Sequence, residues 1–394
     1  MNLDFDVYDA DNHFYEPIDA FTRHLPERYS GAIRYVDIDG RTKIAINNKI
    51  SEYIPNPTFE VVAGPGAWEE YYRGNNPDGK TLREFTGKPI RCEPAFRHPD
   101  DRIKLLDEQG VYATLMFPTL ASLLEERMKD DIELTHAAIS SFNRWMLDEW
   151  SFNYQGRIFP TPIITLPDPR KAIEELEWCV ENGARVVLIR PAPVPGLRGS
   201  RSMALPEFDD FWNAVEQTGI LVTCHSSDSG YDAYTNHWEG GSGEFLPFKL
   251  SPFRLVVNYR RDIYDTLASM ICHGLFARHP AVRVASIENG STWVASLLLE
   301  LSLTYGKMPQ EFAEDPLETF RRHISVSPFY EEDIPGLIDD IGIDRVLFGS
   351  DYPHPEGLGK PLDYINEVAD RSPEDRRKVM SENLKELLTL RPAA

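Results

Sequence analysis

The chain has 394 residues, and its 42% hydrophobic and 26% charged content is typical of a globular protein with a large core. The formal net charge of −22, from 63 acidic and 41 basic residues, disfavours nucleic acids and anionic membranes as partners. Four scattered cysteines without a C-x-x-C pair favour a reduced, cytoplasmic protein, and we expect neither a signal peptide nor a membrane-spanning segment.

A short strand with polar residues at its end is predicted near the start of the chain, over residues 5–13. Because residues two apart on a strand face the same side, we expect Asp9, Asp11 and His13 to project together. Asp11 and His13 at the carboxyl tip offer an oxygen and a nitrogen ligand, which suit a divalent metal such as zinc or manganese. The alternative is a polar strand end that leads into a loop.

Residues 14–99 lack the regular alternation of strands and helices that follows them. We interpret them as an insertion packed over the strand ends rather than as a separate small domain. Within this insertion, residues 34–38 and 42–46 flank Asp39-Gly40, a pair typical of two-residue hairpin turns. The sequence therefore predicts a β-hairpin there.

From Pro99 onward, strand-like and helix-like patterns alternate. Strands are predicted over residues 112–117, 158–165, 184–189, 220–224, 282–287, 324–327 and 345–348. Helices are predicted over residues 100–108, 130–150, 169–181, 206–217, 264–276, 292–305, 334–341, 361–369 and 373–388. A second insertion, residues 226–252, is rich in glycine, serine and aromatic residues, and we expect it to form a mobile lid.

These segments give eight short apolar strands, each but the first followed fairly directly by a helix. Repeated β-α units require parallel strands and right-handed crossovers, and eight of them complete a (β/α)8 TIM barrel. We therefore predict a single barrel domain over residues 1–394, with insertions after strands 1 and 5. The alternative, a doubly wound open sheet, usually has a glycine-rich phosphate loop where this chain has residues 9–13.

Catalytic residues of such barrels lie at the carboxyl ends of the strands. Strand 1 offers Asp11 and His13 there, strand 5 offers His225, strand 6 offers Glu288, and strand 8 offers Asp351. All but Glu288 form a mixed nitrogen and oxygen ligand set for one divalent ion, Zn²⁺ or Mn²⁺, with a water or a substrate oxygen completing the coordination.

On these motifs the chain resembles the amidohydrolase-related branch of the amidohydrolase superfamily, which includes aminocarboxymuconate semialdehyde decarboxylase and the aromatic-acid decarboxylases. The matching segments are residues 9–13, 107–111, 224–225, 274–280 and 349–354. The resemblance implies a distorted (β/α)8 barrel that holds one catalytic metal ion. Carried onto this sequence, the metal ligands are Asp11, His13, His225 and Asp351.

The sequence departs from this family in two places. Many members have histidine where Asp11 stands, although the decarboxylases include members with an acidic residue there. The decarboxylases also usually place a catalytic histidine at the end of strand 6, where this chain reads Ser286-Ile287-Glu288-Asn289-Gly290. Glu288 is thus a candidate acid or base, and the alternative is a structural carboxylate that binds a loop.

Four further residues are candidates with open alternatives. Arg190, after strand 4, is predicted to clamp a substrate carboxylate, or else to form a salt bridge with a nearby acid. His237, in the second insertion, is a candidate substrate-binding residue on the lid. His354 is predicted to contact substrate or to support the site from behind, and Glu16 to orient His13 or to cap a loop.

The residues and the resemblance together predict a metal-dependent, non-oxidative decarboxylase of a small aromatic or unsaturated carboxylic acid. In that reaction Glu288 or His354 would manage the proton that replaces carbon dioxide. The alternative enzyme is a metal-dependent hydrolase of an amide, lactone or related carbonyl bond, in which Asp351 takes the proton of a metal-bound water. A third possibility is a metal-free barrel used for binding.

A small-molecule substrate and a homodimer are the expected partners. The two insertions carry more aromatic residues than barrel loops need, and exposed apolar patches commonly mark interfaces. The residues concerned are Tyr71, Tyr72, Tyr231, Tyr234, Trp238 and Phe245. The family resemblance also implies dimers.

Overall fold

The computed structural model describes residues 3–241, 246, 248, 250–257 and 260–392. Phe245, one of the aromatic residues predicted at an interface, lies outside the described residues. Within the described part of the chain, none of the helices combines the length and the apolar character that crossing a bilayer would require.

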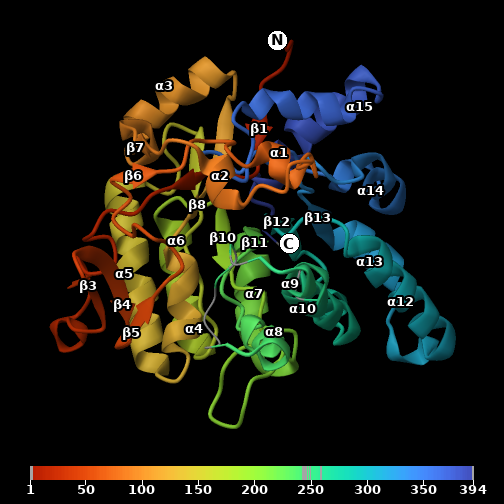
Figure 1. Cartoon of the computed structure of the whole chain (residues 1–394). Coiled ribbons are helices and arrows are strands. Elements are labelled where there is room, and N and C mark those ends of the chain that lie inside the picture. Colours follow the sequence, from red (N-terminus) through yellow and green to blue (C-terminus); the bar gives the residue numbers. More distant parts are fainter. Residues whose placement is uncertain (1–2, 242–245, 247, 249, 258–259, 393–394) are drawn as a thin grey trace.

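A parallel barrel occupies the centre of the molecule (Figure 1). The segments β1 (Tyr8–Asp9) and β2 (His13–Phe14) both pair with β8 (Ala113–Pro118), which also pairs with β9 (Ile158–Pro160). A second sheet runs in the order β10 (Val186–Ile189), β11 (Leu221–His225), β12 (Arg283–Ile287) and β13 (Ile324–Val326). All of these pairs are parallel, as the predicted β-α units require.

Short irregular segments join the two sheets and close the barrel. Ile163 bridges to Leu188 between β9 and β10. Residues 345–348, predicted as the eighth strand, do not form a regular strand. Their backbone nevertheless closes the barrel by hydrogen bonding to both neighbouring strands. The Leu347 amide donates to Val326 O at 2.9 Å, and Phe348 O accepts from the Ala10 amide at 2.8 Å. The predicted (β/α)8 barrel is confirmed.

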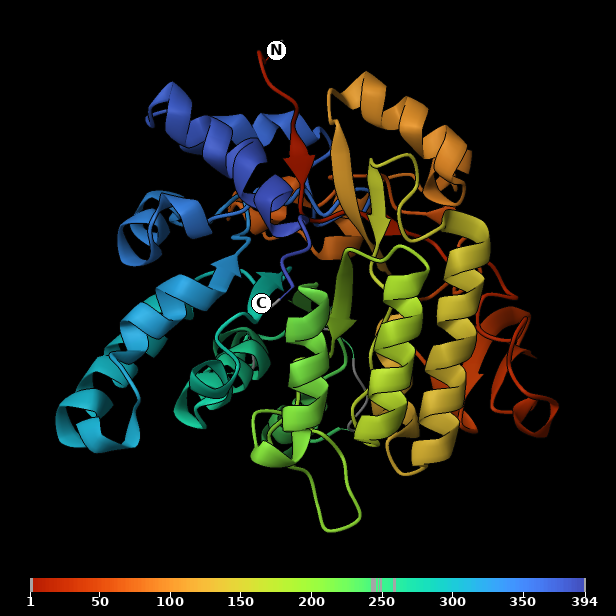
Figure 2. The same ribbon diagram turned by 180° about the vertical axis from the view of Figure 1, so that it is seen from behind.

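Most predicted helices form on the outside of the barrel, where Figure 2 shows α5, α6 and α7 side by side. They are α3 (Pro99–Gln109), α5 (Ile132–Trp150), α6 (Pro169–Glu181), α7 (Asp209–Thr218), α12 (Val294–Lys307) and α14 (Ile334–Ile341). The structure also contains α4 (Leu124–Met128) and α13 (Pro316–His323), which were not predicted.

Three predicted helices differ in detail from the structure. The helix expected over residues 264–276 is two helices, α10 (Arg261–Cys272) and α11 (Leu275–Arg278), separated at Gly274, whose φ is +68°. Residues 361–369 form a 3₁₀ helix, Pro361–Val368. Residues 373–388 are divided by the π-helical turn Lys378–Glu382 between α15 (Pro373–Arg377) and α16 (Asn383–Leu387).

The first insertion contains two small antiparallel sheets, and the predicted hairpin is confirmed. The first sheet contains β3 (Ile33–Ile38), β4 (Arg41–Ile46) and β5 (Lys49–Ser51), and the second pairs β6 (Val61–Val62) with β7 (Ile90–Arg91). Asp39 and Gly40 have φ of +53° and +75°, as a type I′ turn requires. Two short helices, α1 (Glu69–Tyr72) and α2 (Leu82–Thr86), complete the insertion.

The insertion is fastened to the mouth of the barrel. The Trp68 amide donates to Pro355 O at 2.7 Å, and the Gly66 amide donates to His354 O at 3.2 Å. Because these carbonyls belong to the loop that follows Asp351, the insertion lies directly over the strand ends.

A buried arginine holds the end of strand 1 in place. Arg102 Nη1 donates to Asn12 Oδ1 at 2.9 Å, Nη2 to His13 O at 2.6 Å, and Nε to Ala95 O at 2.7 Å. Arg102→Met would leave three buried acceptors without donors, each costing about 1–3 kcal/mol, so we expect a loss of at least ~3 kcal/mol in the free energy of unfolding. Urea denaturation measures this loss. Arg170→Met, at a side chain that is 89% exposed, should change the free energy by less than about 0.5 kcal/mol.

A second buried side chain makes stability depend on pH. His136 Nε2 accepts the backbone N–H of Asp168 at 3.1 Å, which requires the neutral ring. Burial, aided by the charge of Lys171, lowers the pKa of His136 to about 4, against about 6.5 in an unfolded chain. The unfolded state therefore binds the proton first as pH falls, and the stability from the neutral ring is lost between these two values.

His136→Gln keeps an acceptor for the Asp168 amide but removes the titration. We expect the wild-type free energy of unfolding to fall toward low pH more steeply than that of the variant, by up to about 1.4 kcal/mol per pH unit within this window. Parallel curves for the two proteins in a urea series between these pH values would contradict the assignment.

Candidate metal centre and active site

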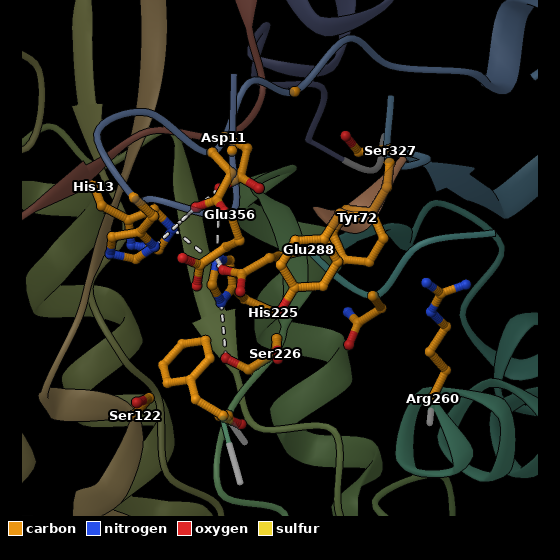
Figure 3. A pocket seen from close by; sticks show the side chains of 18 of the residues that line it. Asp11, His13, Tyr72, Ser122, His225, Ser226, Arg260, Glu288, Ser327 and Glu356 are labelled. Carbon is orange, nitrogen blue, oxygen red and sulfur yellow. Dashed lines mark hydrogen bonds and ion pairs between the residues drawn. The ribbon is translucent and has the colours of Figure 1, made fainter. Parts of the chain in front are cut away.

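A cavity of about 210 Å³ opens at the carboxyl ends of the barrel strands (Figure 3). Six aromatic side chains contribute to its walls. Tyr53 and Tyr72 come from the first insertion, and Tyr231 and Phe248 from the second. The loop after β13 adds Phe329 and Tyr330. The remaining lining residues include the five polar residues predicted at the strand ends, namely Asp11, His13, His225, Glu288 and Asp351.

At the base of the cavity these five side chains converge, and His13 lies at their centre. His13 Nε2 lies 3.3 Å from Asp11 Oδ1, from Glu288 Oε2 and from Asp351 Oδ1. His225 Nε2 lies 2.9 Å from Glu288 Oε2 and 3.5 Å from Asp11 Oδ1. Figure 3 shows the side chains of Asp11, Glu288 and His225 turned toward the same space.

This cluster fits a divalent ion. Asp11 Oδ1, His13 Nε2, His225 Nε2 and Asp351 Oδ1 are buried and make no hydrogen bond with the described residues. Ligand bonds of about 2.0–2.2 Å place neighbouring ligand atoms about 3.0–3.5 Å apart, which matches the spacing of these atoms. Buried polar groups without partners need an explanation, and a cation among them supplies one.

The tautomer of His225 also suits metal binding. His225 Nδ1 lies 2.9 Å from Ser226 O, and a backbone carbonyl only accepts, so Nδ1 carries the proton and donates it there. In the neutral ring the lone pair is then on Nε2, which faces the cluster. Such a second hydrogen bond is how proteins orient metal-binding imidazoles.

Without an ion, the pKa values of the cluster are shifted so that its residues bind protons. Burial alone would lower the pKa of His225, but Glu288 and Asp11 outweigh burial and raise it to about 10. Burial raises the pKa of Asp351, and repulsion by Glu288 raises it further. Protons therefore occupy the cluster when no metal does, and metal binding should release them.

Two of the carboxylates are presented by strained backbone. Glu288 and Asp351 have φ of +53° and +56°, in the left-handed region that non-glycine residues rarely adopt. Asn289 Nδ2 holds the first turn by donating to Cys224 O at 2.9 Å, and the Asp351 amide holds the second by donating to Asp11 O at 2.9 Å. Such strain concentrates at functional sites.

Asp9 does not project with Asp11 and His13, so this part of the strand 1 prediction is wrong. Its carboxylate accepts from the Asp11 amide at 3.0 Å, from Asn12 Nδ2 at 2.8 Å and from Ser350 Oγ at 2.6 Å. Asp9 therefore ties strand 1 to the loop that carries Asp351.

Glu16 takes the second of its two predicted roles. Its Oε1 accepts the amides of Thr119, Leu120 and Ala121 at 3.0, 2.8 and 3.0 Å. Glu16 thus caps the loop after β8 instead of orienting His13.

Neither predicted substrate-binding residue reaches the cavity. Arg190 Nη1 pairs with Glu126 Oε2 at 2.8 Å, beside a separate small cavity, as in the salt-bridge alternative. His237 is exposed on α8 (Asp232–Glu239) and does not line the cavity. The arginines that do line it are Arg254, on α9 (Pro252–Val257), and Arg260, just before α10. Barrel-end reasoning missed them because they do not follow a strand.

His354 lies against the cluster, as one of its predicted roles requires. Its ring stacks on that of His13, with centroids 3.9 Å apart. Nε2 lies 3.1 Å from Thr119 Oγ1, and Nδ1 lies 2.8 Å from Asp351 Oδ1. Thr119 Oγ1 itself donates to Phe14 O, so it accepts from His354 Nε2–H. In this tautomer His354 Nδ1 has a lone pair, and Asp351 Oδ1 is also an acceptor. Their 2.8 Å contact is therefore favourable only when a proton or a cation lies between them.

Glu356 was not predicted and lines the same cavity. Burial raises its pKa to about 8, with a further contribution from Glu288. It lies eight residues past the end of the predicted strand at 345–348, beyond the positions that the barrel rule singles out.

The chain is similar to known proteins over most of its length. A family model described as Amidohydrolase matches residues 8–390. A solved amidohydrolase from Mycobacterium avium subsp. paratuberculosis K-10 is 39% identical, with 98% of this chain and 100% of that chain covered and a TM-score of 0.93.

Two decarboxylases are also similar. Gamma-resorcylate decarboxylase from Rhizobium sp. (strain MTP-10005) is 24% identical over 314 residues, which cover 74% of this chain and 87% of that protein. A dihydroxybenzoic acid decarboxylase from Polaromonas sp. JS666, solved with bound manganese and the inhibitor 2-nitroresorcinol, is 17% identical with a TM-score of 0.55. The match covers 82% of this chain and 93% of that chain.

Proposed function

The chain belongs to the amidohydrolase family, and from this premise we propose that it is a metal-dependent, non-oxidative decarboxylase of a small aromatic or unsaturated carboxylic acid. Membership makes it an enzyme of the carboxy-lyase or hydrolase type, as the sequence resemblance predicted. The similarity to decarboxylases that act on resorcylate and dihydroxybenzoate supports the first type and an aromatic substrate.

One observation carries the proposal: unpaired ligand atoms converge at the base of a cavity with aromatic walls. Asp11, His13, His225 and Asp351 would hold a single divalent ion, Mn²⁺ or Zn²⁺. When bound, such an ion supplies Lewis acidity toward the oxygens of the substrate. The aromatic rings above it suit the faces of a flat, conjugated acid, and about 210 Å³ suits a small one.

Decarboxylation breaks the bond between the carboxyl carbon and the ring, and it leaves an electron pair on the ring carbon. A proton must take the place of carbon dioxide. We assign the delivery of this proton to His354, whose Nδ1 lies 2.8 Å from Asp351 Oδ1 at the cavity wall. Glu288 is less suited, because its Oε2 lies among the ligand atoms, 2.9 Å from His225 Nε2.

Hydrolysis of an amide, lactone or related carbonyl bond is the second candidate. It is favoured by the sequence at the end of β12, where Glu288 stands in place of the histidine usual in the decarboxylases. In that reaction Asp351 would accept a proton from the attacking water, and His354 would carry it to the leaving group.

A panel of aromatic acids, lactones and amides, supplied to enzyme reconstituted with Mn²⁺ or Zn²⁺, separates the two candidates. Carbon dioxide is followed by mass spectrometry, and hydrolysis products by liquid chromatography. We expect carbon dioxide from at least one aromatic acid. Turnover confined to lactones or amides, without carbon dioxide, would replace this proposal by the second candidate.

We also propose that the enzyme is a homodimer. Trp238 is 69% exposed and Tyr234 is 55% exposed on α8 of the second insertion, and Val256 is 83% exposed on α9 (Pro252–Val257), which follows it. Large apolar side chains gathered in this way commonly mark interfaces. Light scattering across a concentration series should give twice the chain mass, and a single species at the monomer mass would refute the dimer.

A further inference from the structure

We infer that Glu288 is a fifth protein ligand of the metal ion, in addition to Asp11, His13, His225 and Asp351. The inference rests on the metal centre of the proposed function and adds to it a ligand from the end of β12. The sequence suggested two other roles for Glu288, an acid or base in the reaction or a structural carboxylate that binds a loop. A metal ligand has neither role.

Distances place Glu288 within the ligand set. Its Oε2 lies 2.9 Å from His225 Nε2 and 3.3 Å from His13 Nε2. The contacts among the other ligand atoms are of similar length: Asp11 Oδ1 and Asp351 Oδ1 each lie 3.3 Å from His13 Nε2, and Asp11 Oδ1 lies 3.5 Å from His225 Nε2. Atoms bound to one ion at about 2.0–2.2 Å have this spacing, so the distances from Glu288 Oε2 to the two imidazoles fit a ligand of the same ion. The potential ligand atoms of Glu288, Asp11, His13 and His225 all lie within 4.8 Å of one another.

The hydrogen-bond inventory supports the same conclusion. His225 Nδ1–H donates to Ser226 O, so the neutral ring has only a lone pair at Nε2. A carboxylate oxygen 2.9 Å from that lone pair is repelled unless a cation lies between them. In the metal-free protein a proton fulfils this role, and in the loaded protein the ion that His225 binds does so.

The backbone conformation around Glu288 directs its carboxylate toward the ligand cluster. In the barrel, Ile287 pairs with His225, and the next residue adopts φ of +53°. Asn289 Nδ2 fixes the turn by donating to Cys224 O and Ile287 O at 2.9 and 2.8 Å. Asp351 reaches the cluster from an equally left-handed residue two strands further along the barrel, with φ of +56°. Both positions keep a strained conformation that delivers a carboxylate to one point.

A fifth ligand changes the character of the centre. Three carboxylates and two imidazoles form an oxygen-rich set with more donors than tetrahedral zinc takes, and such sets suit Mn²⁺ in six-coordinate geometry. The three carboxylates also exceed the charge of a divalent ion by one. Only one position would then remain open for a substrate oxygen while Glu288 is bound.

The test measures metal affinity without substrate. Free Mn²⁺ is counted from its electron paramagnetic resonance signal during titration of the metal-free wild type and of Glu288→Ala. We expect about one ion per wild-type chain and a dissociation constant at least ~100-fold higher for the variant, since even residues behind the ligands cost about 10–100-fold. Glu331→Ala is the matched control, because Glu331 lines the same cavity but interacts with the charges of Glu332, Arg260 and Arg73.

Equal affinity of Glu288→Ala and the wild type would overturn the inference and leave the proposed function standing. Failure of the wild type to bind Mn²⁺ or Zn²⁺ would overturn both. Anomalous diffraction from manganese-loaded wild-type crystals is a second test, and it does not depend on whether Glu288→Ala folds. It should place the ion about 2.0–2.3 Å from a Glu288 oxygen, and a separation beyond about 3.5 Å would contradict ligation.

Discussion

His225→Ala is expected to lower metal affinity at least ~100-fold and to remove the proposed decarboxylase activity with it. The imidazole occupies the end of β11, where Nδ1 is committed to Ser226 O and only Nε2 is directed at the cluster. Its loss removes the imidazole that contacts both Asp11 Oδ1 and Glu288 Oε2. Elemental analysis after dialysis and turnover of the metal-loaded enzyme measure the two effects.

The fold should survive this change, because the backbone pairing of β11 with β10 and β12 does not involve the ring. Circular dichroism of the metal-free proteins checks this expectation. His273→Ala, at an exposed histidine that follows α10, is the matched control and should keep both metal and activity. An active, metal-loaded His225→Ala enzyme would show that the ion binds elsewhere.

His354→Asn is expected to lower turnover about 10²–10⁴-fold while metal content stays at the wild-type level. The ring stacks on His13 and links Thr119 to Asp351, so it can pass a proton at the cavity wall without ligating the ion itself. The pH–rate profile should lose one limb, since a group that titrates in the reaction has been removed.

His273→Asn serves as the matched control for this second variant. Metal loss in His354→Asn would mean that His354 supports the ligands and does not carry the proton. Near-normal turnover with an unchanged pH profile would transfer the proton step to another group of the cavity, such as Glu356.

Local sequence rules were sufficient for the parts of the site that follow regular strands. His225 ends β11 and points into the cavity, as the barrel rule requires. The strand-end positions of Asp11, His13 and Asp351 follow the same rule, and the structure brings all four side chains together. The Asp39-Gly40 hairpin was predictable because its turn chemistry is contained in two residues.

The error at Asp9 has a definite cause in the register of strand 1. Asp9 pairs with Thr114, but His13 pairs with Phe117, so the first strand contains one residue more than its partner between the two pairs. This bulge breaks the alternation of faces that the prediction assumed. Asp9 is consequently turned to Ser350, whereas His13 faces the cavity.

Residues that depend on long-range packing were beyond sequence reasoning. The aromatic walls come from two insertions, and nothing near Tyr53 or Phe248 in the sequence indicates the cavity they line. Arg190 does follow a strand, but Glu126 from an earlier β-α connection pairs with it. The left-handed backbone of Glu288, which turns its carboxylate into the ligand cluster, also depends on contacts from a neighbouring strand.

The most direct test of the account is a titration of metal-free enzyme with Mn²⁺ while carbon dioxide release from an accepted aromatic acid is recorded. The account predicts a linear rise that ends at about one ion per chain, and no release from His225→Ala at the same metal concentrations. Undiminished carbon dioxide release from the chelator-treated wild type, or consumption of the acid without carbon dioxide, would contradict it.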